Sequence, residues 1–232
     1  LLHAVGLRGV DLEALLQFGD GVVAQVVVFG GSGGGQTFFE VEDHALSQGA
    51  ELTVGVEMNF AALLYAHWIL RGETVRYARR SIGRHYAPAS IHVPAVSSTS
   101  VQLICGDALD PPLAPDSFQR VVSLNVLDSL QSAPQHLAVV DGLCVPGGEI
   151  LVASPFAWQS GVVAEEGRLG GADPAATLHE LLTTGTGLSG SYAIGDCREL
   201  RWKLRRDSRS AVSYLTHLVR AHKNIITVPF HR

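Results

Sequence analysis

The chain has 232 residues, of which 47% are hydrophobic and 17% charged, and its formal net charge at pH 7 is -5. This composition is typical of a well-packed globular protein and excludes an intrinsically disordered chain. The acidic balance gives no overall attraction to nucleic acid or to an anionic membrane. No apolar run reaches the ~20 residues of a membrane span, and no leader region is recognisable, so we expect a cytoplasmic protein with one domain over residues 1–232.

Apolar strand patterns alternate with helical patterns along the chain. Strands are expected at residues 24–31, 51–59, 101–108, 120–130 (with the loop that follows), 148–156, 197–206 and 210–221. Helices are expected at residues 11–17, 37–48, 60–68, 134–143 and 174–183, with Asn59 as the N-terminal cap of the third. The pattern is lost over residues 71–100, which we interpret as an irregular insertion. A second insertion, expected on the substrate side, covers residues 159–173.

This alternation predicts an α/β fold, a doubly wound and mostly parallel seven-stranded sheet with right-handed crossovers. The last two expected strands form an antiparallel C-terminal pair. In such sheets, ligands bind outside the carboxyl ends of the strands, at the point where the strand order reverses. The end of the first strand should lie at that edge.

The cysteines and histidines show no spacing that indicates a metal or a disulfide framework. Cys105, Cys144 and Cys197 lie far apart and form no CxxC pair, which favours buried thiols in a reducing compartment. The ten histidines form no HExxH, and His85 and His92 are too loosely placed to indicate zinc, so we expect no metal site.

Basic residues crowd one part of the chain near its end. They are Arg198, Arg201, Lys203, Arg205, Arg206 and Arg209. Two interpretations stay open, the exposed face of a hairpin and a patch for an anionic ligand or nucleic acid. Because no aromatic residues interleave with the basic ones as stacking on bases requires, a nucleic-acid partner is not the expectation.

The first strand ends in a corner with almost no side chains, VVVFGGSGGGQTFF. The strict dinucleotide pattern GxGxxG fails in every register, and no GK[ST] follows as a phosphate loop requires. What remains is a loop of small residues (Gly30, Gly31, Ser32, Gly34) whose backbone can approach a ligand closely. Glu57 ends the next strand, where a carboxylate can accept hydrogen bonds from both hydroxyls of a ribose.

Polar residues also end the third and fourth strands. Asp107 and Ala108 end the third strand, where a carboxylate or an amide can hydrogen-bond an adenine amino group, and Asn125 ends the fourth strand at the same edge. Together with Glu57 and the glycine-rich corner, they predict a nucleoside ligand without a strong demand for phosphate.

In their order and spacing these pieces resemble a class I S-adenosylmethionine-dependent methyltransferase, over about residues 22–157. The matching stretches are VVVFGGSGG, GVEMN, GDALDPPLAPDSFQRVVSLNVLDSL and LCVPGGEILVASPF. The resemblance implies S-adenosylmethionine as cofactor, held by Gly30, Gly31, Ser32, Gly34, Glu57, Met58, Asp107, Ala108 and Asn125. Two positions depart from the family, because Val28 stands where an acid is frequent and Ser32 replaces the middle glycine.

A narrower resemblance concerns NVLDSL, ASPFAW and the LGG at residues 169–171. These stretches are similar to the methyltransferase domain of ovothiol-synthesising enzymes and their bacterial relatives, which methylate an imidazole nitrogen of a thiohistidine. The resemblance implies a small-molecule acceptor, an imidazole nitrogen or a thiol of an amino-acid derivative.

Two residues are candidates on the acceptor side. Asp128 follows Asn125 and can steer or deprotonate the acceptor, or it can cap the next helix. Trp158, just past the fifth strand, can wall the acceptor pocket or belong to the core. Two other functions remain as alternatives, a non-catalytic binding or scaffold protein of the same fold and a nicotinamide oxidoreductase, although the latter needs the dinucleotide fingerprint that the chain lacks. The oligomeric state has no sequence signal.

Overall fold

The computed structural model describes residues 24–29, 51–92, 94–95 and 101–225. The expected helices at residues 11–17 and 37–48 lie outside these ranges, as do Gly30, Gly31, Ser32 and Gly34 of the glycine-rich corner. None of the described helices combines the length and the apolar character that a membrane span requires.

The described elements follow one another in nearly the predicted order. The strands are β1 Ala24–Phe29, β2 Leu52–Glu57, β3 Val75–Ile82, β4 His85–Ile91, β5 Val101–Cys105, β6 Phe118–Leu124, β7 Cys144–Ser154, β8 Tyr192–Arg205 and β9 Ala211–Lys223. The helices are α3 Phe60–Leu70, α4 Ala133–Leu143 and α5 Pro174–Thr184, with the short 3-10 turns η2 Leu127–Ser129 and η3 Glu165–Gly167.

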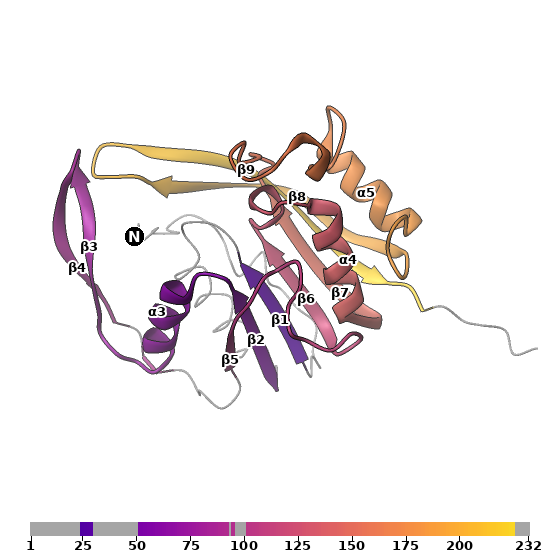
Figure 1. Ribbon diagram of the computed structural model, residues 1–232, viewed down its shortest axis with the longest axis horizontal. Coiled ribbons are helices and arrows are strands. Elements are labelled where there is room, and N and C mark those ends of the chain that lie inside the picture. The colour runs from indigo at the N-terminus through magenta and orange to yellow at the C-terminus, as the bar shows by residue number, and fades with distance from the viewer. Residues whose placement is uncertain (1–23, 30–50, 93, 96–100, 226–232) are drawn as a thin grey trace, which may run out of the picture.

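Within the described residues, seven strands form one sheet in the order β5-β2-β1-β6-β7-β9-β8 (Figure 1). The strands from β5 to β7 are parallel to their neighbours, and β9 runs antiparallel to both β7 and β8. The predicted mostly parallel seven-stranded sheet with an antiparallel C-terminal pair is therefore confirmed. The chain leaves β1 toward β2 and β5 on one side and returns to β6 on the other, so the strand order reverses between β1 and β6.

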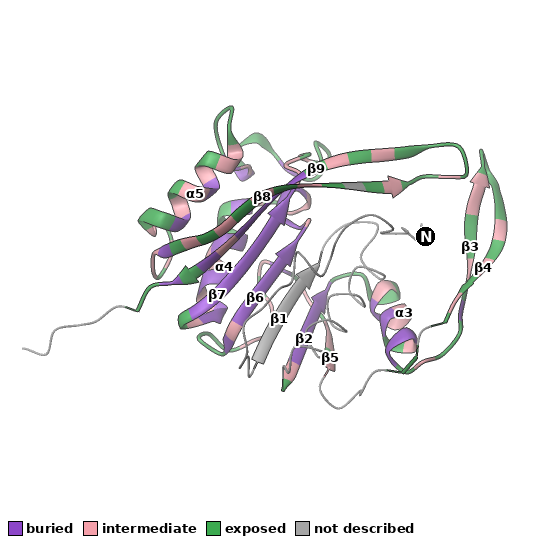
Figure 2. Ribbon diagram, turned by 180° about the vertical axis from the view of Figure 1, so that it is seen from behind, coloured by how far each residue is buried: buried purple, intermediate pink, exposed green. Residues whose placement is uncertain are grey.

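Successive residues of the central strands are buried in two different apolar cores, one on each face of the sheet. On β6, Val121 belongs to the larger core, which includes Leu137 of α4 and Leu178 of α5. The next residue, Val122, belongs to a smaller core with Leu63 of α3. A strand buried on both faces reads as a continuous apolar run, which explains the sequence pattern. Figure 2 shows that burial is concentrated in the central strands.

The helices begin where the sequence provides caps. The Asn59 side chain accepts a hydrogen bond from the backbone N–H of Ala62, so the predicted cap of α3 is confirmed. Ser132 caps α4 in the same way, and Asp173 caps α5. Helix α5 ends at Gly185, which has a left-handed φ of 72° that glycine adopts at little cost.

Residues 71–100 are not irregular throughout, which corrects the sequence interpretation. Strands β3 and β4 pair as an antiparallel hairpin that stands apart from the main sheet (Figure 1). In these two strands only Val75 is buried and the other residues are exposed or half-buried, so the sequence carries no apolar run that marks a core strand. Gly83, at φ 55°, makes the turn, and Tyr77 opposes Ala89 in the ladder.

The C-terminal hairpin extends beyond the carboxyl end of β7. Ser154, the last residue of β7, pairs with His217, so residues 211–216 of β9 and the part of β8 that pairs with them project past the sheet. At the hairpin tip, the backbone N–H of Ser208 donates to the carbonyl of Ser81 on β3 at 2.8 Å. The two hairpins therefore meet on the carboxyl-end side of the sheet (Figure 2).

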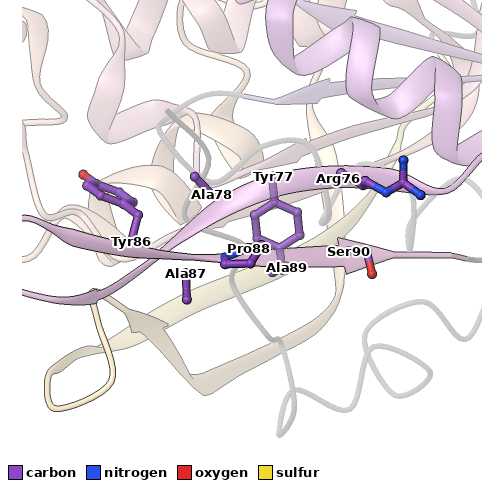
Figure 3. A pocket seen from close by; sticks show the side chains of 8 residues that line it. All are labelled: Arg76, Tyr77, Ala78, Tyr86, Ala87, Pro88, Ala89 and Ser90. Carbon is purple, nitrogen blue, oxygen red and sulfur yellow. The ribbon is translucent and has the colours of Figure 1, made fainter.

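The β3–β4 hairpin also carries an open hollow, which Figure 3 shows at close range. Its lining comes from these two strands alone and is Arg76, Tyr77, Ala78, Tyr86, Ala87, Pro88, Ala89 and Ser90. Most of these side chains are small, and the hollow opens widely to solvent. A ligand site is usually a more enclosed pocket with several polar groups that point toward one centre, so we do not assign a ligand to this hollow.

Of the three thiols, only Cys144 is buried, whereas Cys105 and Cys197 are exposed, so the expectation of buried thiols holds for one residue. Burial raises the pKa of the Cys144 thiol to about 12, despite the nearby Lys223 ammonium. That ammonium is itself buried and donates to the backbone carbonyls of Asp141 and Cys144. It also pairs with the Asp141 carboxylate at 3.0 Å.

Candidate cofactor and acceptor site

Glu57 ends β2 at the carboxyl edge of the sheet, one strand away from the reversal point. The side chain is only 7% exposed, and its Oε1 accepts a hydrogen bond of 2.8 Å from the backbone N–H of Asn59. Its Oε2 is buried and has no hydrogen-bond partner among the described residues. Burial raises the pKa of the Glu57 carboxyl, against the lowering effect of the backbone hydrogen bonds from Asn59 and Met58. A buried carboxylate oxygen without a partner is costly unless a ligand supplies donors.

Asn125 follows β6 at the reversal point. Its backbone N–H donates to the carbonyl of Ala153 at 2.8 Å, which ties it to the end of β7. Its φ is 55°, a left-handed conformation that non-glycine residues adopt rarely and that asparagine tolerates better than most. The Oδ1 atom is buried without a partner in the described part of the chain. Backbone strain and an unsatisfied polar atom at the same position are typical of a binding residue.

Asp107 and Ala108 follow β5, whose end is tied to β2 by a hydrogen bond from the Gly106 N–H to the Glu57 carbonyl. Asp107 is exposed, and its Oδ1 accepts from the backbone N–H of Leu109 at 2.9 Å, which fixes the turn. Ala108 is buried. The fold therefore brings both residues to the same edge as Glu57, as predicted.

His136 of α4 supports this turn, a role that sequence reasoning missed. The ring is fully buried, with Nδ1 3.1 Å from the Ala108 carbonyl and Nε2 2.8 Å from the Ser123 hydroxyl. Since a carbonyl only accepts, Nδ1 carries the proton and Nε2 accepts from Ser123. Burial lowers the pKa of His136 to about 4, so the ring is neutral at pH 7. His136 lies between apolar residues of a helix, and no local sequence pattern indicates that its ring bridges Ala108 and Ser123.

Asp128 lies in η2, just after Asn125, and is 5% exposed. Its Oδ2 accepts a hydrogen bond of 3.1 Å from the backbone N–H of Ala157, beyond β7. Its Oδ1 is buried without a partner among the described residues, and burial raises the pKa of the carboxyl. The alternative interpretation of Asp128 as a helix cap is wrong for α4, because Ser132 caps that helix.

Trp158 is partly buried and packs against the margin of the larger core. Its ring centroid lies 5.9 Å from that of Phe156. Phe156 also stacks on His217 of β9, with ring centroids 6.2 Å apart. Phe156 has a left-handed φ of 49°, which places a second strained non-glycine residue at this edge.

Met58 is the least enclosed of the described candidates. Its side chain is 70% exposed, and its carbonyl accepts a weak hydrogen bond from the Cys105 thiol. Neighbouring Phe60 is also largely exposed, so two large apolar side chains lie in the segment that follows β2.

Comparisons with known proteins bear on the fold of the chain. No protein-family model matches the sequence, and none of the curated proteins searched matches it. Solved structures do match: a candidate methyltransferase from Bacillus halodurans is 11% identical, with a TM-score of 0.57 over 92% of this chain and 99% of that one. A candidate S-adenosylmethionine-dependent methyltransferase from Listeria monocytogenes is 15% identical, with a TM-score of 0.52 over 92% and 96%.

A third structural neighbour is the [4+2]-cyclase SpnF, which is 13% identical with a TM-score of 0.51 over 89% of this chain and 76% of that one. At these identities the likeness establishes the fold. The chain therefore has the fold of the class I S-adenosylmethionine-dependent methyltransferases, as the resemblance of its motifs indicated.

Proposed function

We propose that this protein is an S-adenosylmethionine-dependent methyltransferase that acts on a small-molecule acceptor. The observation that carries the proposal is the buried Glu57 Oε2, which lacks a partner in the described part of the chain at the edge where this fold binds ligands. Two hydroxyls of a ribose would supply the missing donors there.

The remaining candidates fit the same ligand. Asp107 and Ala108 follow β5, on the adenine side of the ribose, and Asn125 follows β6, on the side where the strand order reverses. Gly30, Gly31, Ser32 and Gly34 follow β1 in the sequence, and Met58 follows Glu57. We assign these residues to the cofactor, with Asn125 Oδ1 as a second buried acceptor that awaits a donor such as an ammonium group.

The cofactor supplies an electrophilic methyl group on its sulfonium, so the protein's main task is alignment of the acceptor. Orientation of this kind lowers barriers by about 7–11 kcal/mol in favourable intramolecular reactions. Asp128 is assigned to the acceptor, because Oδ2 is held by Ala157 while Oδ1 is buried without a described partner. Burial raises the pKa of the Asp128 carboxyl, which makes its carboxylate a stronger base for a proton from the acceptor.

We assign the acceptor to small nucleophiles with an imidazole nitrogen or a thiol, such as an amino-acid derivative. The narrower sequence resemblance supports this class. Trp158, through its contact with Phe156, supports the wall of the acceptor side. The segment 159–173 covers this side and is anchored by the buried Val163 and Leu169.

Thermal unfolding with and without S-adenosylhomocysteine tests the cofactor assignment. A hundredfold excess over the dissociation constant should stabilise the protein by about 2.7 kcal/mol. The acceptor is then sought by incubating the protein with methyl-labelled S-adenosylmethionine and histidine, thiohistidine or cysteine derivatives. No stabilisation by the cofactor product would contradict the proposal.

A non-catalytic binding protein of the same fold is the second candidate. Val28, where the methyltransferases often carry an acid, favours it, and the cyclase SpnF illustrates that this fold is not restricted to one reaction. Stabilisation by S-adenosylhomocysteine without turnover of any acceptor would favour this candidate.

A further inference from the structure

We propose that His179, Cys197 and His217 form a zinc site with three protein ligands. The three residues come from α5, β8 and β9, and their ligand atoms all lie within 4.8 Å of one another. Sequence spacing gave no hint of the cluster, because 18 and 20 residues separate the members of its two thiol–imidazole pairs. The proposal does not depend on methyl transfer.

The distances between the ligand atoms are those of one tetrahedral zinc ion. His179 Nε2 lies 3.0 Å from His217 Nε2, and Cys197 Sγ lies 3.5 Å from the former and 3.6 Å from the latter. Zinc–nitrogen bonds of about 2.0–2.1 Å and a zinc–sulfur bond of about 2.3 Å place ligand atoms about 3.3–3.6 Å apart at tetrahedral angles. The observed spacing differs from this by a few tenths of an ångström, which small rotations of the side chains can supply.

Glu199 prepares His217 for metal binding. Its Oε1 lies 2.7 Å from His217 Nδ1, and since an ionised carboxylate only accepts, Nδ1 carries the proton. In the neutral ring, the lone pair of Nε2 then points toward His179 and Cys197. A carboxylate behind a ligating histidine is the usual outer partner in zinc sites, where it fixes the tautomer and raises the basicity of the ligand.

The fold holds this arrangement through sheet register. Glu199 and His217 are directly opposed in the β8–β9 ladder, and Cys197 lies two residues before Glu199. Side chains two residues apart on a strand share a face, so all three lie on one face of the hairpin. Helix α5 contacts β8 and brings His179 to this face, while its Leu178 and Leu182 are buried in the larger core.

The chemistry of the ligands selects zinc over harder ions. Two imidazoles and a thiolate are soft and borderline ligands, which suit zinc and not magnesium or calcium. His217 is buried, whereas Cys197 is exposed. With three protein ligands, the fourth position is left to water or another small ligand, as in zinc sites that are not closed.

Metal titration of the purified full chain tests the proposal. Calorimetry with Zn²⁺ should give one equivalent bound per chain. Co²⁺ in place of zinc should give the visible absorption of a tetrahedral ion together with a thiolate-to-cobalt charge-transfer band. Failure to bind a stoichiometric metal, or a cobalt spectrum without the thiolate band, would overturn the proposal.

Matched variants locate the site. Cys197→Ser and His217→Ala should abolish stoichiometric binding, and Glu199→Gln should weaken it by roughly 10- to 100-fold. Cys105→Ser and His85→Ala, which change an exposed thiol and an exposed histidine elsewhere, should bind zinc as the wild type does. Unchanged binding in Cys197→Ser, with a thermal transition like that of the wild type, would place the metal elsewhere.

Alkylation provides a readout within one sample. Zn²⁺ should slow the reaction of Cys197 with iodoacetamide and leave the exposed Cys105 unaffected, as peptide mass spectrometry would record. Equal protection of both thiols, or of neither, would count against a site at Cys197.

Discussion

Two buried carboxylates, Glu57 and Asp128, share a feature that is typical of ligand-binding residues. Each has one oxygen held by a backbone N–H and one buried oxygen without a partner among the described residues. The sequence identified both from their positions after strands, because the carboxyl ends of parallel strands meet at one edge. It could not show the missing partners, because these depend on the neighbours that the fold provides.

The Glu57→Gln variant separates the effect of Glu57 on ligand affinity from its effect on the stability of the fold. Loss of the charged acceptor should weaken S-adenosylhomocysteine binding by about 1.5–3 kcal/mol, measured by calorimetry. Since burial raises the folded-state pKa of Glu57, the ionised form opposes folding at neutral pH. The variant without ligand should therefore be at least as stable as the wild type at pH 7, with a smaller advantage as the pH falls and Glu57 becomes protonated.

The matched control is Glu51→Gln, which removes an exposed carboxylate just before the same strand. It should leave the affinity unchanged. Unchanged affinity in a folded Glu57→Gln variant would remove the ribose assignment.

Asp128→Asn tests the acceptor role. The amide oxygen can keep the hydrogen bond from Ala157, whereas the charge is lost, so we expect a 10²- to 10⁴-fold fall in kcat if Asp128 takes a proton. Affinity for S-adenosylhomocysteine should stay within about twofold of the wild type. Asp110→Asn, at an exposed position, serves as control. A kcat equal to that of the wild type would restrict Asp128 to its structural contact.

At the scale of elements, the regular βα units could be predicted and the hairpin of β3 and β4 could not. The buried strands have apolar runs, and α3 has a capping asparagine with apolar residues at helical spacing, so local patterns suffice. The β3–β4 hairpin buries few apolar side chains. Its Ser81 contacts Ser208, which lies 127 residues further along the chain. A structure held by such distant contacts leaves no period in the sequence.

Gly167→Ala tests how tightly the segment 159–173 is packed. A Cβ at Gly167 would come within 2.0 Å of the Gln131 carbonyl oxygen, so η3 or the loop before α4 must move. We expect a loss of about 1–3 kcal/mol in unfolding free energy, the usual range for overpacking. Denaturant unfolding measures it.

Gly161→Ala in the same segment is the control, because no atom of the described residues lies within 4 Å of the Cβ that alanine would add there. Equal stability of the two variants would show that the segment 159–173 yields easily at Gly167.

At the scale of the whole molecule, the mostly parallel direction of the strands and the antiparallel C-terminal pair could be predicted from the alternation of elements, whereas the order of the strands in the sheet is known from the structure alone. The candidate site could be predicted from the sequence less completely than the fold. The reversal point between β1 and β6 could be anticipated, whereas the His136 bridge and the cluster of His179, Cys197 and His217 depend on packing between distant elements. Such contacts arise from register and helix docking, which residue patterns along the chain do not encode.

The free energy of unfolding should fall at acidic pH because of His136. Its folded-state pKa of about 4 is below the ordinary value of 6.5, so the unfolded chain takes up a proton first as the pH falls. The contribution of the neutral His136 ring to the free energy of unfolding is fully present above pH ~6.5. About 3 kcal/mol of it is lost as the pH falls from ~6.5 to ~4. Urea unfolding of the wild type and of His136→Gln across this range isolates the effect, since other groups titrate alike in both. A variant as sensitive to pH as the wild type would contradict this origin.

A crystal structure with S-adenosylhomocysteine bound tests the assignment of the cofactor site to the carboxyl edge of the sheet. We expect the ribose hydroxyls within hydrogen-bonding distance of Glu57, the adenine beside Asp107 and Ala108, and the sulfur near Asn125, where the strand order reverses. Binding of the compound at another place, or side chains of the protein filling the space beside Glu57 Oε2, would contradict it.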